Sequence, residues 1–145
     1  MIKHKIFSLD DNEKIHGFIT PWSIVHFNFG ILGYLYLKFF FKKISNLKCF
    51  IITIIIHTIY EKKDLIITKL YLKNKHNYKN NNKNVKFLNF FKIYYNSLFN
   101  CIGDTLMCIL GFLFISNFKT NKILIIIFTL LFYFMHTIGT KYKLA

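Results

Sequence analysis

The sequence predicts an all-α polytopic membrane protein with four transmembrane helices in up-and-down order. Of its 145 residues, 54% are hydrophobic and 19% are aromatic, which is more apolar than ordinary soluble domains. The apolar residues also gather in four runs separated by polar segments. Because a chain of this length fits one domain, we predict a single membrane domain over residues 1–145.

The first two apolar runs lie in the N-terminal half. Residues 22–41 (WSIVHFNFGILGYLYLKFFF) have about the length needed to cross the hydrocarbon core, and Trp22 suits the membrane interface. Residues 45–61 form a shorter run rich in isoleucine, a residue that favours strands in water. In lipid a lone strand would leave its backbone groups without hydrogen bonds, so we predict a helix here as well.

The other two runs lie near the C-terminus, at residues 97–118 and 122–140. A tight polar turn separates them, so we predict two antiparallel helices. Four helices in up-and-down order leave both termini and the loop between the second and third helices on one side of the membrane. That side carries most of the 20 basic residues. The positive-inside rule therefore predicts that both termini and the long loop are cytosolic.

The long polar segment between the second and third runs, about residues 62–95, is predicted to be a loop. At its centre, NKHNYKNNNKN (residues 74–84) is an Asn/Lys tract whose composition is typical of disorder. On either side, LIITKLYLK (65–73) and VKFLNFFKIYY (85–95) mix apolar and lysine positions. This mixture suits short helices that lie in the membrane interface.

The net charge of +14 raises the question of a nucleic-acid partner. All the basic residues are lysines, whereas arginine is the usual bidentate reader of phosphate and guanine. We therefore predict no specific nucleic-acid binding and expect membrane lipids as partners. The sequence contains no phosphate-cradling glycine loop, no GxSxG and no paired cysteine–histidine signature of soluble catalysis. The sequence does not indicate which cofactor, if any, the protein uses, and it leaves the oligomeric state open.

Polar side chains fall at similar depth in all four predicted spans. At about 1.5 Å of rise per residue, the ionisable ones lie in the membrane half on the side of the termini. A spacing of four also places His57 with Glu61 on one helix face, and Asn100 with Asp104 on another. Ionisable groups at such depth normally face a bundle interior or a wet cavity, so we predict one interior polar cluster. Its predicted members are His26, His57, Glu61, Asn96, Asn100, Asp104 and His136.

A purely structural interpretation stays open for several of these residues. Asn96 and Ser97 suit the N-cap of the third helix, and Glu61 suits a solvated position among lipid headgroups. A single histidine such as His26 or His136 suits an interior hydrogen bond. Asp104 is harder to explain in this way, because burying an unpaired carboxylate is costly or forces its protonation.

Two segments resemble the VanZ-like integral membrane proteins. They are HTIYE (residues 57–61) and NSLFNCIGDTLMCILGF (residues 96–112). VanZ-like proteins carry a membrane glutamate and, after a variable loop, an Asp, an Asn four residues later and a Gly three residues further on. Small residues follow along the same helix. The matching positions are Glu61, Asn100, Gly103 and Gly111, whereas Asn96 stands where the pattern has Asp.

The segments are closer still to an uncharacterised group of multi-spanning proteins of bacteria and large DNA viruses. That group has a Ser after the first acidic position and a Gly-Asp pair, matched here by Ser97 and by Gly103 with Asp104. Tyr60 replaces the usual tryptophan, and the arginine before the third helix is missing. The resemblance covers residues 20–118, and it implies a multi-spanning fold without an assigned activity.

Three functions are compatible with the predicted cluster. We favour a VanZ-like membrane protein of unassigned activity whose cluster binds a lipid or polyprenyl-phosphate headgroup. The alternative is a non-catalytic membrane scaffold or interaction protein, in which the polar groups only fix helix packing. A third is an intramembrane metal-dependent hydrolase, with the three histidines and Asp104 as zinc ligands and Glu61 as base. Because no HExxH or comparable motif accompanies these residues, we assign no metal site.

Overall fold

The computed structural model describes residues 1–9, 14–75 and 96–142, and this part of the chain is mostly helical. The coarse prediction of an α-helical fold is therefore confirmed. Two short strands precede four long helices. The elements are β1 (Lys3–Phe7), β2 (Ile15–Ile19), α1 (Ser23–Phe40), α2 (Asn46–Lys75), α4 (Leu98–Ser116) and α5 (Lys122–Tyr142).

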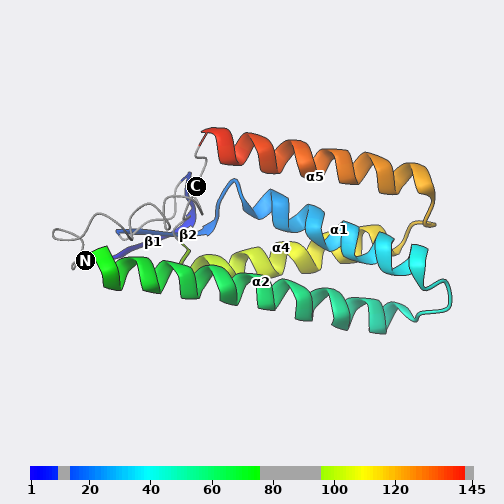
Figure 1. The fold of residues 1–145 in the computed structure, drawn as a ribbon, viewed down its shortest axis with the longest axis horizontal. Helices are drawn as coiled ribbons and strands as arrows, with labels where there is room; N and C mark the ends of the chain where they lie inside the picture. Colours follow the sequence, from blue (N-terminus) through cyan, green and yellow to red (C-terminus); the bar gives the residue numbers. More distant parts are fainter. Residues whose placement is uncertain (10–13, 76–95, 143–145) are drawn as a thin grey trace.

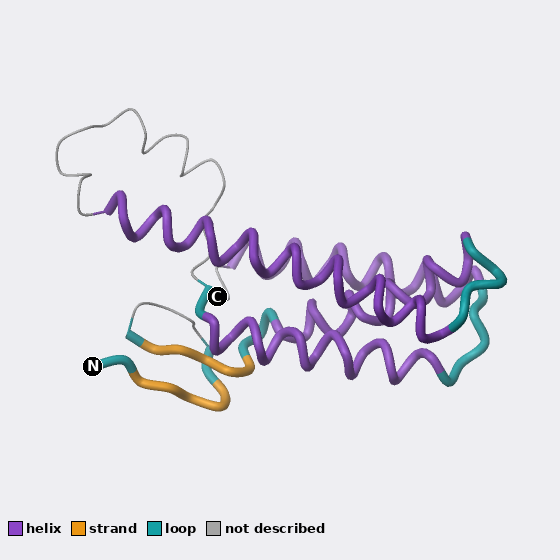
Figure 2. The backbone as a smooth tube through the Cα atoms, turned by 90° about the horizontal axis from the view of Figure 1, so that it is seen from below, coloured by secondary structure: helices purple, strands orange, loops and turns teal. Residues whose placement is uncertain are grey.

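The four helices lie along one axis and run alternately in opposite directions (Figure 1). Helix α1 is the central one, because it packs against α2, α4 and α5, while α2 also packs against α4. The short connections at residues 41–45 and 117–121 lie at one end of the bundle. The strands lie at the other end, beside the start of α1 (Figure 2).

The second helix is much longer than predicted. The sequence predicts that it ends at Glu61, but α2 continues to Lys75. It includes residues 65–73, predicted as a separate interfacial helix, and the first two residues of the tract 74–84 that is predicted to be disordered. The charges after Glu61 mark a change in the expected surroundings, yet no proline or glycine interrupts the helix, and lysine is a good helix former. The predicted disordered tract from residue 76 and the predicted interfacial helix at 85–95 lie outside the described residues.

The strands at the N-terminus were not predicted. β1 and β2 pair in parallel, with Lys3 opposite Ile15 and Phe7 opposite Ile19. β2 packs against the first turns of α4, where the Phe18 ring lies 5.0 Å from that of Phe99. Five residues with interspersed lysine and histidine give too short an alternation to reveal a strand from sequence.

Glycines allow α1 and α4 to approach each other closely. A Cβ atom at Gly30 would overlap the carbonyl oxygen of Cys108, and one at Gly111 would overlap that of Phe27. Small residues at such crossings let helix backbones touch, which is the usual packing mode in membrane bundles. The adjoining apolar core lies toward the 41–45 end and consists of Ile31, Tyr34, Leu35, Cys49, Phe112 and Ile115.

The helices differ in how well they meet the criteria for a membrane span. Within the described ranges, α4 is the one helix long and apolar enough by length and composition, while Lys122–Ile138 of α5 is apolar but shorter. Helix α1 contains His26, Asn28 and Lys38 within its 18 residues. The described residues thus give one candidate span by this criterion, compared with the four that the sequence pattern predicts.

Candidate functional site

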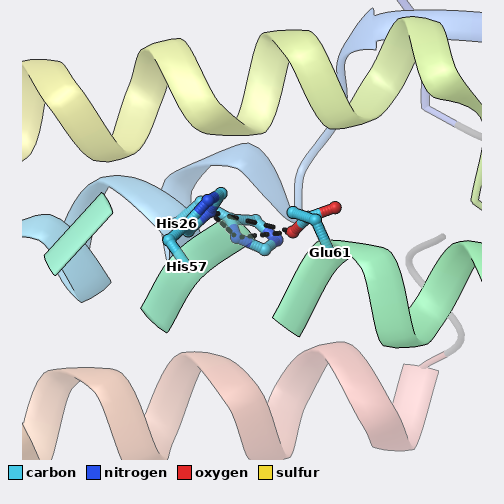
Figure 3. A group of neighbouring side chains, drawn as sticks. All are labelled: His26, His57 and Glu61. Carbon is cyan, nitrogen blue, oxygen red and sulfur yellow. Dashed lines mark hydrogen bonds and ion pairs between the residues drawn. The ribbon is translucent and has the colours of Figure 1, made fainter. Parts of the chain in front are cut away.

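Two histidines from different helices form the centre of the polar cluster. His26 lies in the first turn of α1 and His57 lies in α2, and their rings meet edge to face with centroids 5.0 Å apart. Nδ1 of His26 is 2.9 Å from Nε2 of His57 (Figure 3). Because these two nitrogens face each other, either one of them carries the shared proton or both lone pairs are available to a cation.

Glu61 joins the two histidines from one turn further along α2. Its Oε1 lies 3.3 Å from Nδ1 of His26 and 3.7 Å from Nε2 of His57. Its Oε2 accepts a hydrogen bond of 2.9 Å from Nδ2 of Asn96, which precedes α4. The predicted spacing of four therefore places His57 and Glu61 together, and Asn96 fixes the carboxylate from the opposite side.

Asp104 lies on the other side of the His26 ring. Its Oδ2 is 3.5 Å from Nε2 of His26, and its Oδ1 accepts a hydrogen bond of 2.5 Å from the Ser23 hydroxyl. The Ser23 oxygen in turn accepts a hydrogen bond from the backbone N–H of Thr20. Sequence reasoning missed Ser23, although its position three residues before His26 puts both on one face of α1.

The cluster is buried but not fully satisfied by its own hydrogen bonds. Glu61 is 4% exposed and Asp104 is 1% exposed, while His57 is fully buried. Oε1 of Glu61 and Nδ1 of His57 have no hydrogen-bond partner within the described residues. Buried polar atoms are usually paired, and an ionised group in a low dielectric is costly unless compensated. A further positive or hydrogen-bonding group at Oε1 of Glu61 would therefore stabilise the cluster.

The asparagines of the predicted cluster have different roles. Asn96 bonds to Glu61, and its backbone N–H donates to Thr68. Ser97 is the N-cap of α4, because its hydroxyl accepts from the backbone N–H of Asn100, as the structural interpretation predicts. The Asn100 side chain is buried one turn from Asp104, but its Nδ2 has no hydrogen-bond partner in the described part of the chain.

His136 does not join the cluster. It is exposed on α5, its ring lies edge-on to Trp22 at 5.8 Å, and it stacks on Phe132 at 6.3 Å. The predicted depth depends only on the number of residues along the helix. The direction in which a side chain points also depends on how α5 is rotated against α1, and that rotation was not readable from the sequence.

A groove between α2 and α4 reaches the cluster at Glu61. Its cavity volume is about 370 Å³, within the range of small-molecule sites. Most of its walls are apolar, and the ionisable side chains of Glu61 and Lys62 lie together on its α2 wall. The groove is lined by Thr58, Glu61, Lys62, Leu65, Leu98, Cys101, Ile102, Thr105 and Leu106.

One group in the described residues has the composition of a metal site. The candidate ligand atoms of His26, His57 and Glu61 all lie within 4.8 Å of one another. This set differs from the zinc ligands considered from sequence, because Glu61 replaces Asp104 as the carboxylate ligand and His136 lies elsewhere. The cluster is therefore chemically suited to a divalent cation.

Comparison with known proteins adds no relative. No family model, no curated protein and no solved structure matches this chain.

Proposed function

We propose that the chain is a multi-pass, VanZ-like integral membrane protein with four transmembrane helices. The distribution of polar and apolar side chains supports this proposal. Large apolar residues such as Ile55 on α2 and Leu130 on α5 are more than half exposed, whereas Glu61 and Asp104 are buried. Extended exposed apolar faces are unfavourable in water, while in lipid the polar groups are expected to turn inward.

Lysines at the ends of the bundle fit the same proposal. Lys42, Lys43 and Lys48 are exposed at or near the 41–45 connection, and Lys38 directs its ammonium to the backbone oxygen of Ile44 at 2.7 Å. Long cationic side chains near helix ends can place their charge at the level of the headgroups, as the exposed lysines here would do. On the opposite side we propose that both termini and the long loop face the cytosol, because that side carries most of the lysines.

The function that we propose is binding of a membrane lipid with a phosphate headgroup, either a glycerophospholipid or a polyprenyl phosphate. The single observation that carries this proposal is the groove between α2 and α4. Its apolar walls suit a hydrocarbon chain, and the exposed Lys62 suits the phosphate. Glu61 adds a carboxylate oxygen for a hydroxyl group of the ligand. The headgroup thus binds at the Glu61 end, and the buried histidines lie behind it.

Native mass spectrometry on the detergent-purified protein tests this function. The variant Ile102→Trp fills the groove, and Leu110→Trp is its matched control, because Leu110 has similar exposure on the same helix but does not line the groove. We expect bound phospholipid or added polyprenyl phosphate in the wild type and in Leu110→Trp, and its loss in Ile102→Trp. Equal lipid retention in all three proteins would contradict a groove-specific site.

The scaffold alternative predicts a different result. If the polar groups only fix helix packing, Ile102→Trp and Leu110→Trp retain the same annular lipid and have similar thermal stability. A second variant, Lys62→Ala, separates the two interpretations further. Loss of the phosphate-bearing lipids alone, with neutral lipids retained, supports the headgroup role of Lys62.

A further inference from the structure

Three ligand atoms converge inside the bundle from two helices. The mutual contacts are made by Nδ1 of His26, Nε2 of His57 and Oε1 of Glu61. From their arrangement we propose that these three residues bind a divalent transition-metal ion, with zinc as the first candidate. This proposal does not depend on lipid binding in the groove, because it rests on the contacts among these three side chains, of which only Glu61 also lines the groove.

The separations between the three atoms suit one shared ion. They are 2.9 Å between the two nitrogens, and 3.3 Å and 3.7 Å from the carboxylate oxygen to the nitrogens of His26 and His57. Zinc binds nitrogen and oxygen at about 2.0–2.2 Å, so neighbouring ligands of a tetrahedral ion are about 3.3–3.5 Å apart. The observed separations fall on both sides of this value, and small side-chain rotations would equalise them.

The groups behind the ligands have the arrangement that metal sites use. A histidine that binds a metal through one ring nitrogen normally turns the other toward a carboxylate or carbonyl. Nε2 of His26 faces Oδ2 of Asp104 at 3.5 Å, and Ser23 holds that carboxylate from its other oxygen. The free oxygen of the ligand carboxylate is also engaged, since Oε2 of Glu61 accepts from Asn96. His26 is therefore oriented by Asp104 on α4, and Glu61 is oriented by Asn96 just before α4.

The charge of the cluster also favours a bound cation. Glu61 and Asp104 bring two carboxylates into the buried cluster, and Oε1 of Glu61 has no hydrogen-bond partner among the residues that the structure describes. A divalent ion at this oxygen would supply the missing positive charge in surroundings of low dielectric. It would also use the facing lone pairs of His26 and His57, which otherwise need a shared proton.

Two histidines and one glutamate are a ligand set of catalytic zinc sites, which keep a fourth position for water or a substrate oxygen. The same set with two further open positions is typical of non-haem iron(II). Glu61 also lines the groove between α2 and α4, so the metal site and the groove meet at this residue. The chemical class of the ligand is thus a borderline divalent ion with nitrogen and oxygen donors.

Metal binding is measured on the full-length protein in detergent, without a histidine tag and after treatment with a chelator. His4 and His16 lie next to each other on the strands, with rings 5.2 Å apart, and form a second place where zinc can collect. The measurements therefore use a His4→Ala/His16→Ala background. Zinc, cobalt(II) and iron(II), the last under anaerobic conditions, are titrated separately, and bound metal is counted by elemental analysis after dialysis.

We expect about one metal ion per chain in this background protein, and at least a 100-fold weaker affinity in Glu61→Gln and in His57→Ala. The matched control is His136→Ala, which removes a histidine at similar depth outside the cluster and should bind metal normally. Cobalt(II) should give the visible absorption bands of a four-coordinate site in the background protein, with the bands lost in Glu61→Gln. A higher affinity for iron(II), with spectra of a six-coordinate ion, would identify iron in place of zinc as the metal of the same site.

Equal affinity and equal stoichiometry in the background protein, Glu61→Gln and His57→Ala would show that the metal binds elsewhere, and this result would overturn the proposal. The absence of stoichiometric binding in the background protein would overturn it as well. Circular dichroism without metal shows whether the variants fold. If they do not, the cobalt(II) spectrum of the background protein, in which His26, His57 and Glu61 are intact, decides the question, because the absence of four-coordinate bands would contradict the proposal. Ile102→Trp should keep the metal while losing the lipid, so failure of either proposal is distinguishable from failure of the other.

Discussion

Asn96 donates a hydrogen bond of 2.9 Å from its side-chain amide to Oε2 of Glu61, and so joins the start of α4 to the middle of α2. The VanZ-like pattern that residues 57–61 and 96–112 resemble has an aspartate at position 96. With aspartate in place of Asn96, two carboxylates would face each other at this distance. The amide therefore lowers the negative charge of the cluster and provides a donor for Glu61.

The first prediction concerns this contact. Asn96→Asp should be less stable than the wild type at pH 8, by about 1–3 kcal/mol, because it loses the donor and adds a like charge. As the pH falls, the two carboxyls can share a proton, so the stability difference should shrink on acidification and grow as the pH rises. Thermal unfolding in detergent at pH 8 and at lower pH is the measurement.

Asn96→Ala is the control, because it removes the same hydrogen bond without adding a carboxylate. Its loss of stability should show little of the pH dependence seen for Asn96→Asp. If both variants respond to pH in the same way, charge repulsion between residues 96 and 61 does not explain the effect.

The second prediction concerns the crossing of α1 and α4. Gly30→Ala and Gly111→Ala should each destabilise the bundle by about 1–3 kcal/mol, because the added methyl group overlaps a backbone carbonyl of the neighbouring helix. Alanine is a better helix former than glycine by about 1 kcal/mol, so the measured loss is the net of both effects. Unfolding by heat or denaturing detergent gives the comparison.

Gly33→Ala provides the matched control on α1. A methyl group there meets the buried side chain of Thr53, which can change rotamer, rather than a backbone carbonyl, which moves only with its helix. We expect a smaller loss of stability than for Gly30→Ala. The double variant Gly30→Ala/Gly111→Ala should lose less than the sum of the single variants, because either methyl group already separates the same two helices. A larger loss for Gly33→Ala would contradict this view of the crossing.

Much of the helical framework is predictable from the sequence, whereas contacts between helices are only partly so. The apolar runs place α1, α4 and α5 close to their observed bounds, since a long unbroken apolar run has few alternatives to a helix. The predicted end of α2 at Glu61 was wrong. The charges after Glu61 favour a more polar environment, but they do not break the backbone hydrogen bonds of the helix. A helix boundary and a membrane boundary are thus different signals.

The candidate site shows the same division. The spacing of four brings His57 and Glu61 together, as predicted, because it depends on the geometry of a single helix. His26 on α1 and Asp104 on α4 lie 3.5 Å apart. Their shared predicted depth favours this contact, but it does not fix the direction of either side chain. His136 lies beside Trp22 near the start of α1, but its side chain is exposed and outside the cluster, since its direction depends on the rotation of α5. Spacing along one helix is therefore readable from sequence, and rotation requires the packed structure.

The third prediction tests whether the exposed apolar faces lie in lipid. Ile55→Lys and Leu130→Lys each place a charge on an exposed face of a proposed span, away from its ends. In a membrane, each lysine should raise the apparent free energy of insertion by about 2.5–3.5 kcal/mol. We expect less protein in the membrane fraction after alkaline extraction and faster degradation in cells.

Phe41→Lys is the control, because Phe41 is exposed just after α1 and precedes two lysines at the end of the bundle. It should insert as well as the wild type. If Ile55→Lys and Leu130→Lys instead yield folded protein in the soluble fraction, the exposed faces do not contact lipid, and the four-span proposal would have to be abandoned.

The fourth prediction concerns how Asp104 acts on the proposed metal ligand His26. Because Asp104 faces Nε2 while Nδ1 would bind the proposed ion, Asp104→Asn should weaken zinc binding by about 10–100-fold without changing the number of sites. Ser23→Ala removes the hydroxyl that holds Asp104 and should cause a smaller loss of affinity. The matched control is Asp64→Asn, because Asp64 pairs with Lys63 outside the cluster. Titrations that give Asp104→Asn and Asp64→Asn the same zinc affinity would limit Asp104 to helix packing, since a carboxylate that orients a ligand must change the strength of the bond that the ligand makes.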